Sequence, residues 1–71
     1  MKIQIQIINE YGVFDGEILL VNAVQYSNIV DMSKSFHESG FEMTTEDGGF
    51  IIIPPELVKK SILKINILED V

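Results

Sequence analysis

The chain has 71 residues, no cysteine, and a net charge of −6 that arises from 11 acidic and 5 basic side chains. Without cysteine it can form neither a disulfide nor a thiolate metal site. The acidic balance disfavours direct binding to nucleic acid or to an anionic membrane. A chain of this length predicts one small domain, residues 1–71, that buries only roughly 60% of its unfolded surface. A hydrophobic content of 46% therefore predicts exposed apolar surface, which a protein partner or a homodimer would cover.

The N-terminal segment predicts a strand, a turn and a second strand. Residues 2–8 alternate between apolar and polar side chains, which is typical of a half-buried strand with its odd-numbered isoleucines facing inward. Residues 9–12 interrupt this alternation as a turn or bulge. Asp15-Gly16 is a strong signal for a two-residue hairpin turn, so residues 17–21 are expected to return as the second strand.

The same opening alternation lacks the continuous apolar core of a signal peptide. No apolar run approaches the roughly 18 residues that a membrane-spanning helix needs. These two features lead us to expect a cytoplasmic protein without a membrane segment.

Residues 22–39 carry the start and stop signals of a helix. Asn22 and Gln25 have the spacing of a capping box, in which each side chain accepts a hydrogen bond from the other residue's backbone amide. Apolar side chains recur at helical spacing as far as Phe36. Gly40 suits the left-handed position that ends many helices. We therefore expect one long amphipathic helix.

A second hairpin follows. Residues 41–46 alternate, with Phe41 and Met43 expected to face inward. Residues 47–49, Asp-Gly-Gly, predict a turn into the continuous apolar run 50–53. Such a run is typical of a strand that is buried on both faces or covered by a partner. On this interpretation Ile52 is buried, and Ile52→Asp is expected to prevent folding.

The C-terminal quarter begins with two prolines. Pro54 cannot donate to a strand ladder, and Pro55 suits the first position of a short helix. Residues 62–68 can be read as an extension of that helix, but their alternation and β-branched content favour a last strand. The chain is therefore predicted to be an α+β domain of order β-β-α-β-β-short α-β. We expect a mostly antiparallel sheet of about five strands with one long helix on one face.

The residues offer little for catalysis or for binding a cofactor. His37 is the only histidine, and the carboxylates show neither a catalytic pairing nor the spacing of a calcium loop. None of the serines stands in a nucleophile-elbow context, and no glycine-rich phosphate loop precedes a helix. We therefore expect no catalytic residue, no metal site and no cofactor, and hence a protein that is not an enzyme.

The candidate protein-interaction residues are Glu42, Thr44, Glu46 and Asp47. The first three alternate with the inward side chains of the third predicted strand, so they should share its solvent face. Charge on such a strand commonly protects an edge or maintains solubility. The functional interpretation is an acidic surface that imitates DNA phosphates and occupies a basic groove on another protein.

Residues 49–60, Gly-Phe-Ile-Ile-Ile-Pro-Pro-Glu-Leu-Val-Lys-Lys, resemble a segment of the swapped-hairpin transition-state regulators and their antitoxin relatives. In those families a glycine, an apolar strand, Ile-Pro and Glu-Leu end a strand and open a short helix. The resemblance implies an intertwined dimer that grips DNA.

Three functions remain open from the sequence. The leading one is a small acidic inhibitor or regulator that binds another protein, of the kind that phages and other mobile elements encode. The second is a dimeric DNA-binding regulator or antitoxin. The third, an enzyme or small-ligand carrier, would need a pocket that so short a chain can hardly spare.

Overall fold

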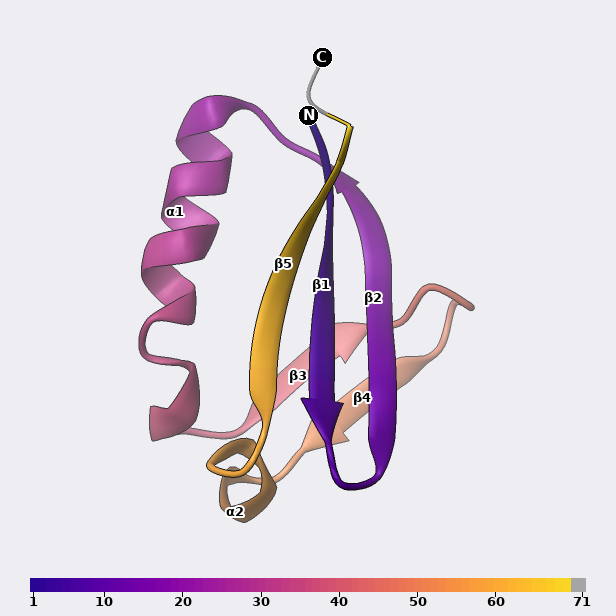
Figure 1. The fold of residues 1–71 in the computed structure, drawn as a ribbon, viewed down its shortest axis with the longest axis vertical. Coiled ribbons are helices and arrows are strands. Elements are labelled where there is room, and N and C mark those ends of the chain that lie inside the picture. Colours follow the sequence, from indigo (N-terminus) through magenta and orange to yellow (C-terminus); the bar gives the residue numbers. More distant parts are fainter. Residues whose placement is uncertain (70–71) are drawn as a thin grey trace.

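The computed structural model describes residues 1–69 and has the predicted α+β class and element order. Its elements are, in chain order, β1 (Lys2–Asn9), β2 (Gly12–Leu20), α1 (Ala23–Ser33), the 3₁₀ turn η1 (Phe36–Glu38), β3 (Phe41–Thr44), β4 (Phe50–Ile53), α2 (Pro55–Val58) and β5 (Ile62–Glu69). The five antiparallel strands form two sheets instead of the single sheet expected from the sequence. Figure 1 shows the larger sheet in front of the smaller one.

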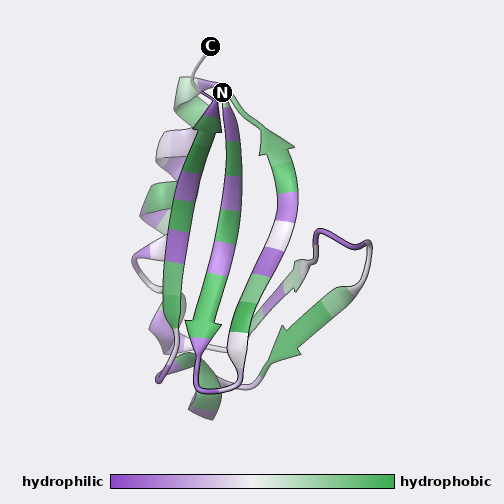
Figure 2. Cartoon of the chain, turned by 45° about the vertical axis from the view of Figure 1, so that its right-hand side comes forward, coloured by the Kyte–Doolittle hydropathy of each residue, from purple (hydrophilic) through white to green (hydrophobic). Residues whose placement is uncertain are grey.

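The larger sheet has the strand order β2-β1-β5, so β1 lies in its centre and both of its neighbours run antiparallel to it. The predicted alternation is confirmed, because Ile3 and Ile7 are completely buried and Ile5 packs against the core. We call the face that carries these three side chains the inner face. α1 and the β3–β4 hairpin both lie on this side of the sheet (Figures 1 and 2).

The predicted turn at Asp15-Gly16 is wrong. The chain reverses at residues 10–11, and Asp15-Gly16 lies within β2. Two local features favour the earlier turn: the Asn9 side chain accepts a hydrogen bond from the Tyr11 amide at 2.9 Å, and Gly12 adopts a φ of 133° that other residues rarely reach.

Gly16 forms part of a β-bulge instead. Ile18 pairs with Gln4 and Asp15 with Gln6, so two residues of β2 lie opposite Ile5 of β1. Gly16 is buried, and a β-carbon there would lie 3.0 Å from the carbonyl oxygen of Ile5. The glycine is therefore explained by close backbone approach and not by a turn.

The smaller sheet consists of β3 and β4 alone. The predicted turn between them is confirmed, with Gly48 at a φ of 87°. The bulge of β2 joins the two sheets: Gly16 forms an isolated bridge with Thr45, and the amide of Glu46 donates to the carbonyl oxygen of Asp15 at 3.0 Å. Because these contacts are confined to one short segment, the hairpin forms a second layer and does not extend the first sheet.

The helix begins as predicted. The Asn22 side chain accepts from the amide of Gln25 at 2.8 Å, and the Gln25 side chain accepts from the amide of Asn22 at 2.9 Å. These two bonds satisfy backbone donors that the first turn of a helix leaves free.

The helix ends earlier than residue 39. α1 stops at Ser33, where the Ser33 hydroxyl donates to the carbonyl oxygen of Ile29 at 2.7 Å and the Ser35 hydroxyl to that of Met32 at 3.1 Å. Serine side chains that compete in this way for backbone carbonyls weaken a helix. Gly40 has no positive φ, so the predicted left-handed stop is also wrong.

The break in the helix lets Phe36 turn into the core. Phe36 is buried in η1 and packs edge-to-face on Phe41, with ring centroids 5.1 Å apart. The core consists of Ile7, Phe36, Ile53 and Val58, which come from β1, η1, β4 and α2. It therefore lies between the inner face and the hairpin, and α1 contributes no fully buried residue.

The apolar run of β4 is not buried on both faces. Ile53 is only 2% exposed, whereas Ile52 is 70% and Phe50 61% exposed. The physical reason is that β4 pairs with β3 in a two-stranded layer, of which only one side meets the core.

The C-terminal quarter follows the predicted order. Pro55 is the first residue of α2, as expected, and Ile62–Glu69 form a strand and not a helix. Within residues 1–69, no helix has the length and apolar character needed to cross a membrane.

Candidate protein-interaction surface

The β3–β4 register divides the hairpin into two faces. Directly opposed residues of an antiparallel pair project to the same side. The pairs Phe41–Ile53 and Met43–Ile51 face the core. The pairs Glu42–Ile52 and Thr44–Phe50 face away from it and are exposed. We call Glu42, Thr44, Phe50 and Ile52 the outer hairpin face.

The outer hairpin face combines two apolar side chains with one carboxylate and one hydroxyl. Figure 2 shows β4 as a hydrophobic strand that stands apart from the larger sheet. Because the opposite side of the hairpin is held by the core, the face is presented on packed backbone. A rigid scaffold of this kind lowers the entropy that binding would otherwise cost.

The hairpin turn is stabilised by Asp47. Its carboxylate accepts hydrogen bonds from the Thr45 hydroxyl and from the amide of Gly49, the second at 3.1 Å. The hydrogen bond from Thr45, and to a smaller extent the one from Gly49, lowers the pKa of Asp47 below its ordinary value. Asp47 therefore remains ionised at neutral pH and fixes the turn that carries it.

Acidic side chains gather where this turn meets β2. Asp15, Glu46 and Asp47 line a shallow cleft of about 400 Å³, together with Val13 and Phe14. The Asp15 carboxylate accepts from the Gln6 side chain at 2.8 Å. The three carboxylates add a local negative potential to one end of the hairpin, which extends the acidic character of the outer face.

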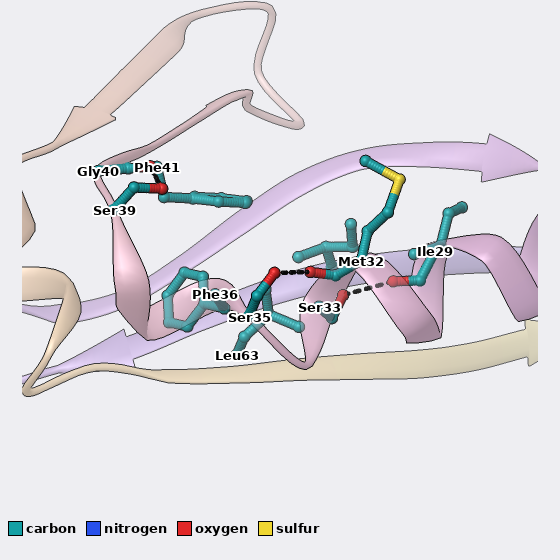
Figure 3. A pocket seen from close by; sticks show the side chains of 10 residues that line it. Ile29, Met32, Ser33, Ser35, Phe36, Ser39, Gly40, Phe41 and Leu63 are labelled. Atoms are coloured by element: carbon teal, nitrogen blue, oxygen red, sulfur yellow. Dashed lines mark hydrogen bonds between the residues drawn. The ribbon is translucent and has the colours of Figure 1, made fainter.

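A separate apolar pocket of about 290 Å³ lies between α1, the inner face and the start of β3 (Figure 3). Its apolar lining comes from Ile5, Ile29, Met32, Phe36, Phe41 and Leu63. The hydroxyls of Ser33, Ser35 and Ser39 all donate to nearby backbone carbonyls, as the dashed lines in Figure 3 show. None of the ten lining residues is ionisable, so the pocket offers apolar contact and no group that could transfer a proton at neutral pH.

His37 is used structurally. Its Nε2 donates to the carbonyl oxygen of Ser61 at 2.8 Å, and its ring packs against Phe36 with centroids 5.0 Å apart. These contacts tie η1 to the segment that precedes β5. Among residues 1–69, no three His, Asp or Glu side chains lie close enough together to hold a metal ion.

The structure brings together only part of the predicted site. Glu42 and Thr44 share the outer hairpin face, but Glu46 and Asp47 lie in the turn and not in the strand register. Phe50 and Ile52 also belong to this face, although the sequence predicts a run that is buried on both faces or covered by a partner. The period of two could have placed them outside, because strand neighbours point to opposite faces and only one face of a hairpin need be covered.

Comparisons with protein families, curated proteins and solved structures found no match to this chain. The segment that resembles the swapped-hairpin regulators spans β4 and α2. It ends a strand and opens a short helix, as the resemblance implies. Its strand, β4, pairs with β3 of the same chain.

Proposed function

We propose that this chain is a small non-enzymatic regulator or inhibitor that binds another protein through the outer hairpin face. The partner is a protein whose basic groove has an apolar floor, such as a groove that otherwise holds nucleic acid. The observation that carries the proposal is the exposure of Ile52 and Phe50 beside Glu42 on a hairpin whose other side is packed.

The apolar side chains would supply affinity. Interfaces depend on a few large side chains at their centre, surrounded by polar residues that exclude water. Burying Phe50 and Ile52 completely would contribute about 1.5–3 kcal/mol each before the cost of association is subtracted.

The carboxylates would supply steering and selectivity. Glu42 lies within the face, and Glu46 and Asp47 lie at its end, in a chain whose net charge is −6. A field of this sign speeds the encounter with a basic groove and repels acidic surfaces, and the effect weakens as salt rises.

Charge reversal at the hairpin tests the proposal. The double variant Glu42→Lys/Glu46→Lys should lose capture of the partner from a cell lysate, and capture by the unaltered chain should weaken between low and high salt. The captured protein is identified by mass spectrometry, and its binding is then measured with purified components. We expect the double variant to weaken that binding by tenfold or more.

A matched control changes the net charge equally at a distance. Glu10 lies in the β1–β2 turn and Glu38 in η1, and both are exposed. The variant Glu10→Lys/Glu38→Lys should retain capture, whereas Ile52→Ser should lose it without loss of stability. Equal loss in the hairpin and control variants would show that net charge alone is responsible, and full retention by the hairpin variant would exclude this face.

A further inference from the structure

One of the two edges of the larger sheet, that of β5, lies beside an overhanging helix. β5 is an edge strand of eight residues, bonded to β1 on one side only. Within residues 1–69, β1 is the only element to which the backbone of Ile62–Glu69 is hydrogen-bonded. In Figure 1 α1 lies beyond the β5 edge, and after the rotation in Figure 2 it lies behind β5. The helix therefore extends past the edge on the inner side.

A groove of about 330 Å³ occupies the space between α1 and β5. Val30, Leu63 and Ile65 give it an apolar lining, and all three are only partly buried. Lys34 and His37 also line it. A strand added at the β5 edge would place alternate side chains against this lining, in the position where a packed helix normally covers a sheet.

We infer that this groove binds an extended segment of a partner protein, which adds to the larger sheet as a strand beside β5. The exposed row of backbone donors and acceptors would supply main-chain hydrogen bonds, and the groove would select the side chains. This surface is separate from the outer hairpin face, so the inference does not depend on the function proposed above.

The groove and the strand register define the chemistry of the segment. Leu63 and Ile65 point to the inner face and Lys64 to the opposite one, because their partners on β1 are Ile7, Ile5 and Gln6. The segment should carry apolar residues opposite the first two and an acidic residue between them. Lys64 forms neither of the two ion pairs found within residues 1–69, so its charge is available for that residue.

A second copy of this chain fits the edge poorly. Pairing two β5 strands about a two-fold axis would bring the α1 of both copies over the same two strands. Figure 1 shows α1 and η1 together running along most of β5. The two helical segments would compete for one space, so the occupant is a strand without an overhanging helix.

The test uses a dye-labelled, blocked nonapeptide, Thr-Val-Thr-Val-Glu-Val-Thr-Val-Thr, which presents the same pattern in either direction. We expect saturable binding by fluorescence anisotropy and slower hydrogen exchange at β5 amides in the complex. A peptide with Lys in place of Glu should bind about fivefold more weakly, since like charges opposite each other on paired strands repel. Lys64→Glu should reverse this preference.

Two controls distinguish the outcomes. The hairpin variant Glu42→Lys/Glu46→Lys should bind the peptide with no more than a twofold change, and Val30→Asp should lose binding of both peptides while its circular dichroism spectrum is kept. Lack of saturation up to 1 mM peptide, or protection of hairpin amides in place of β5, would overturn the inference. A dimer of the chain that dissociates on Lys64→Glu would also overturn it, by showing that a second copy occupies the edge.

Discussion

In the run Phe50–Ile53, four apolar side chains of one short strand meet two different environments. Ile53 packs with Ile7 and Val58, whereas Ile52 is directed to the solvent side of the hairpin. Both positions carry isoleucine, so only the direction of the side chain distinguishes them. The pair therefore offers a test in which chemistry is constant and burial varies.

We predict that Ile53→Asp prevents cooperative folding, whereas Ile52→Asp still folds cooperatively and lowers the free energy of unfolding by only about 1 kcal/mol, the cost of a strand aspartate opposite Glu42. A carboxylate at residue 53 would be buried without a partner, which costs several kcal/mol, a large part of the stability of a small domain. Thermal and urea unfolding of both variants give the measurement. Comparable losses at the two positions would show that the outer hairpin face is covered in solution.

At the scale of elements, the bulge in β2 determines how the two sheets meet. It introduces an extra residue opposite Ile5, and the same segment provides the bridge to Thr45 and the bond to Glu46. The bulge thus places the hairpin turn against β2. Gly16 is central to this junction because backbone and side-chain atoms from both sheets surround it.

Gly16→Ala should destabilise the protein by about 1–3 kcal/mol, the usual cost of overpacking a filled interior. The added β-carbon would lie 3.0 Å from the Ile5 carbonyl oxygen and 3.1 Å from the Met43 sulfur. Gly48→Asn is the comparison, because asparagine tolerates positive φ and the site has no neighbouring atom within 4 Å. Chemical denaturation should show a loss only at residue 16, and an unaffected Gly16→Ala would contradict the close approach.

At the scale of the whole molecule, the core is small and asymmetric. Within residues 1–69, five hydrophobic residues are buried and eleven large ones are exposed. The buried ones come from β1, η1, β4 and α2 and none from α1. The larger sheet and the hairpin therefore hold the fold together, and α1 is attached by half-buried contacts.

This asymmetry predicts two levels of hydrogen-exchange protection. Amides of β1, which is bonded on both sides and carries the buried Ile3 and Ile7, should exchange only on global unfolding. Amides of α1 should exchange through smaller openings and with a lower free energy. Native-state exchange followed residue by residue provides the measurement, and equal protection of the two elements would show that α1 is part of the same cooperative core.

Local signals in the sequence determined the parts of this fold that need only nearby residues. The capping box at Asn22, the turn at residues 47–49, the proline that opens α2 and the inward isoleucines of β1 all act over a few positions. The candidate residues Glu42 and Thr44 were also placed correctly on a solvent face, because strand alternation is a local rule.

The tertiary structure alone decided what depends on distant neighbours. Asp15-Gly16 is a favourable turn sequence, yet it forms a bulge because Ile5 and Thr45 pack against it. The helix breaks after Ser33, and Phe36 enters the core. The apolar run of β4 is divided between core and solvent because two strands form a layer with a single covered side. The sequence specifies which side chains are apolar, but the arrangement of the layers decides which of them are buried. Here that arrangement leaves Phe50 and Ile52 exposed, and the proposed binding rests on this exposure.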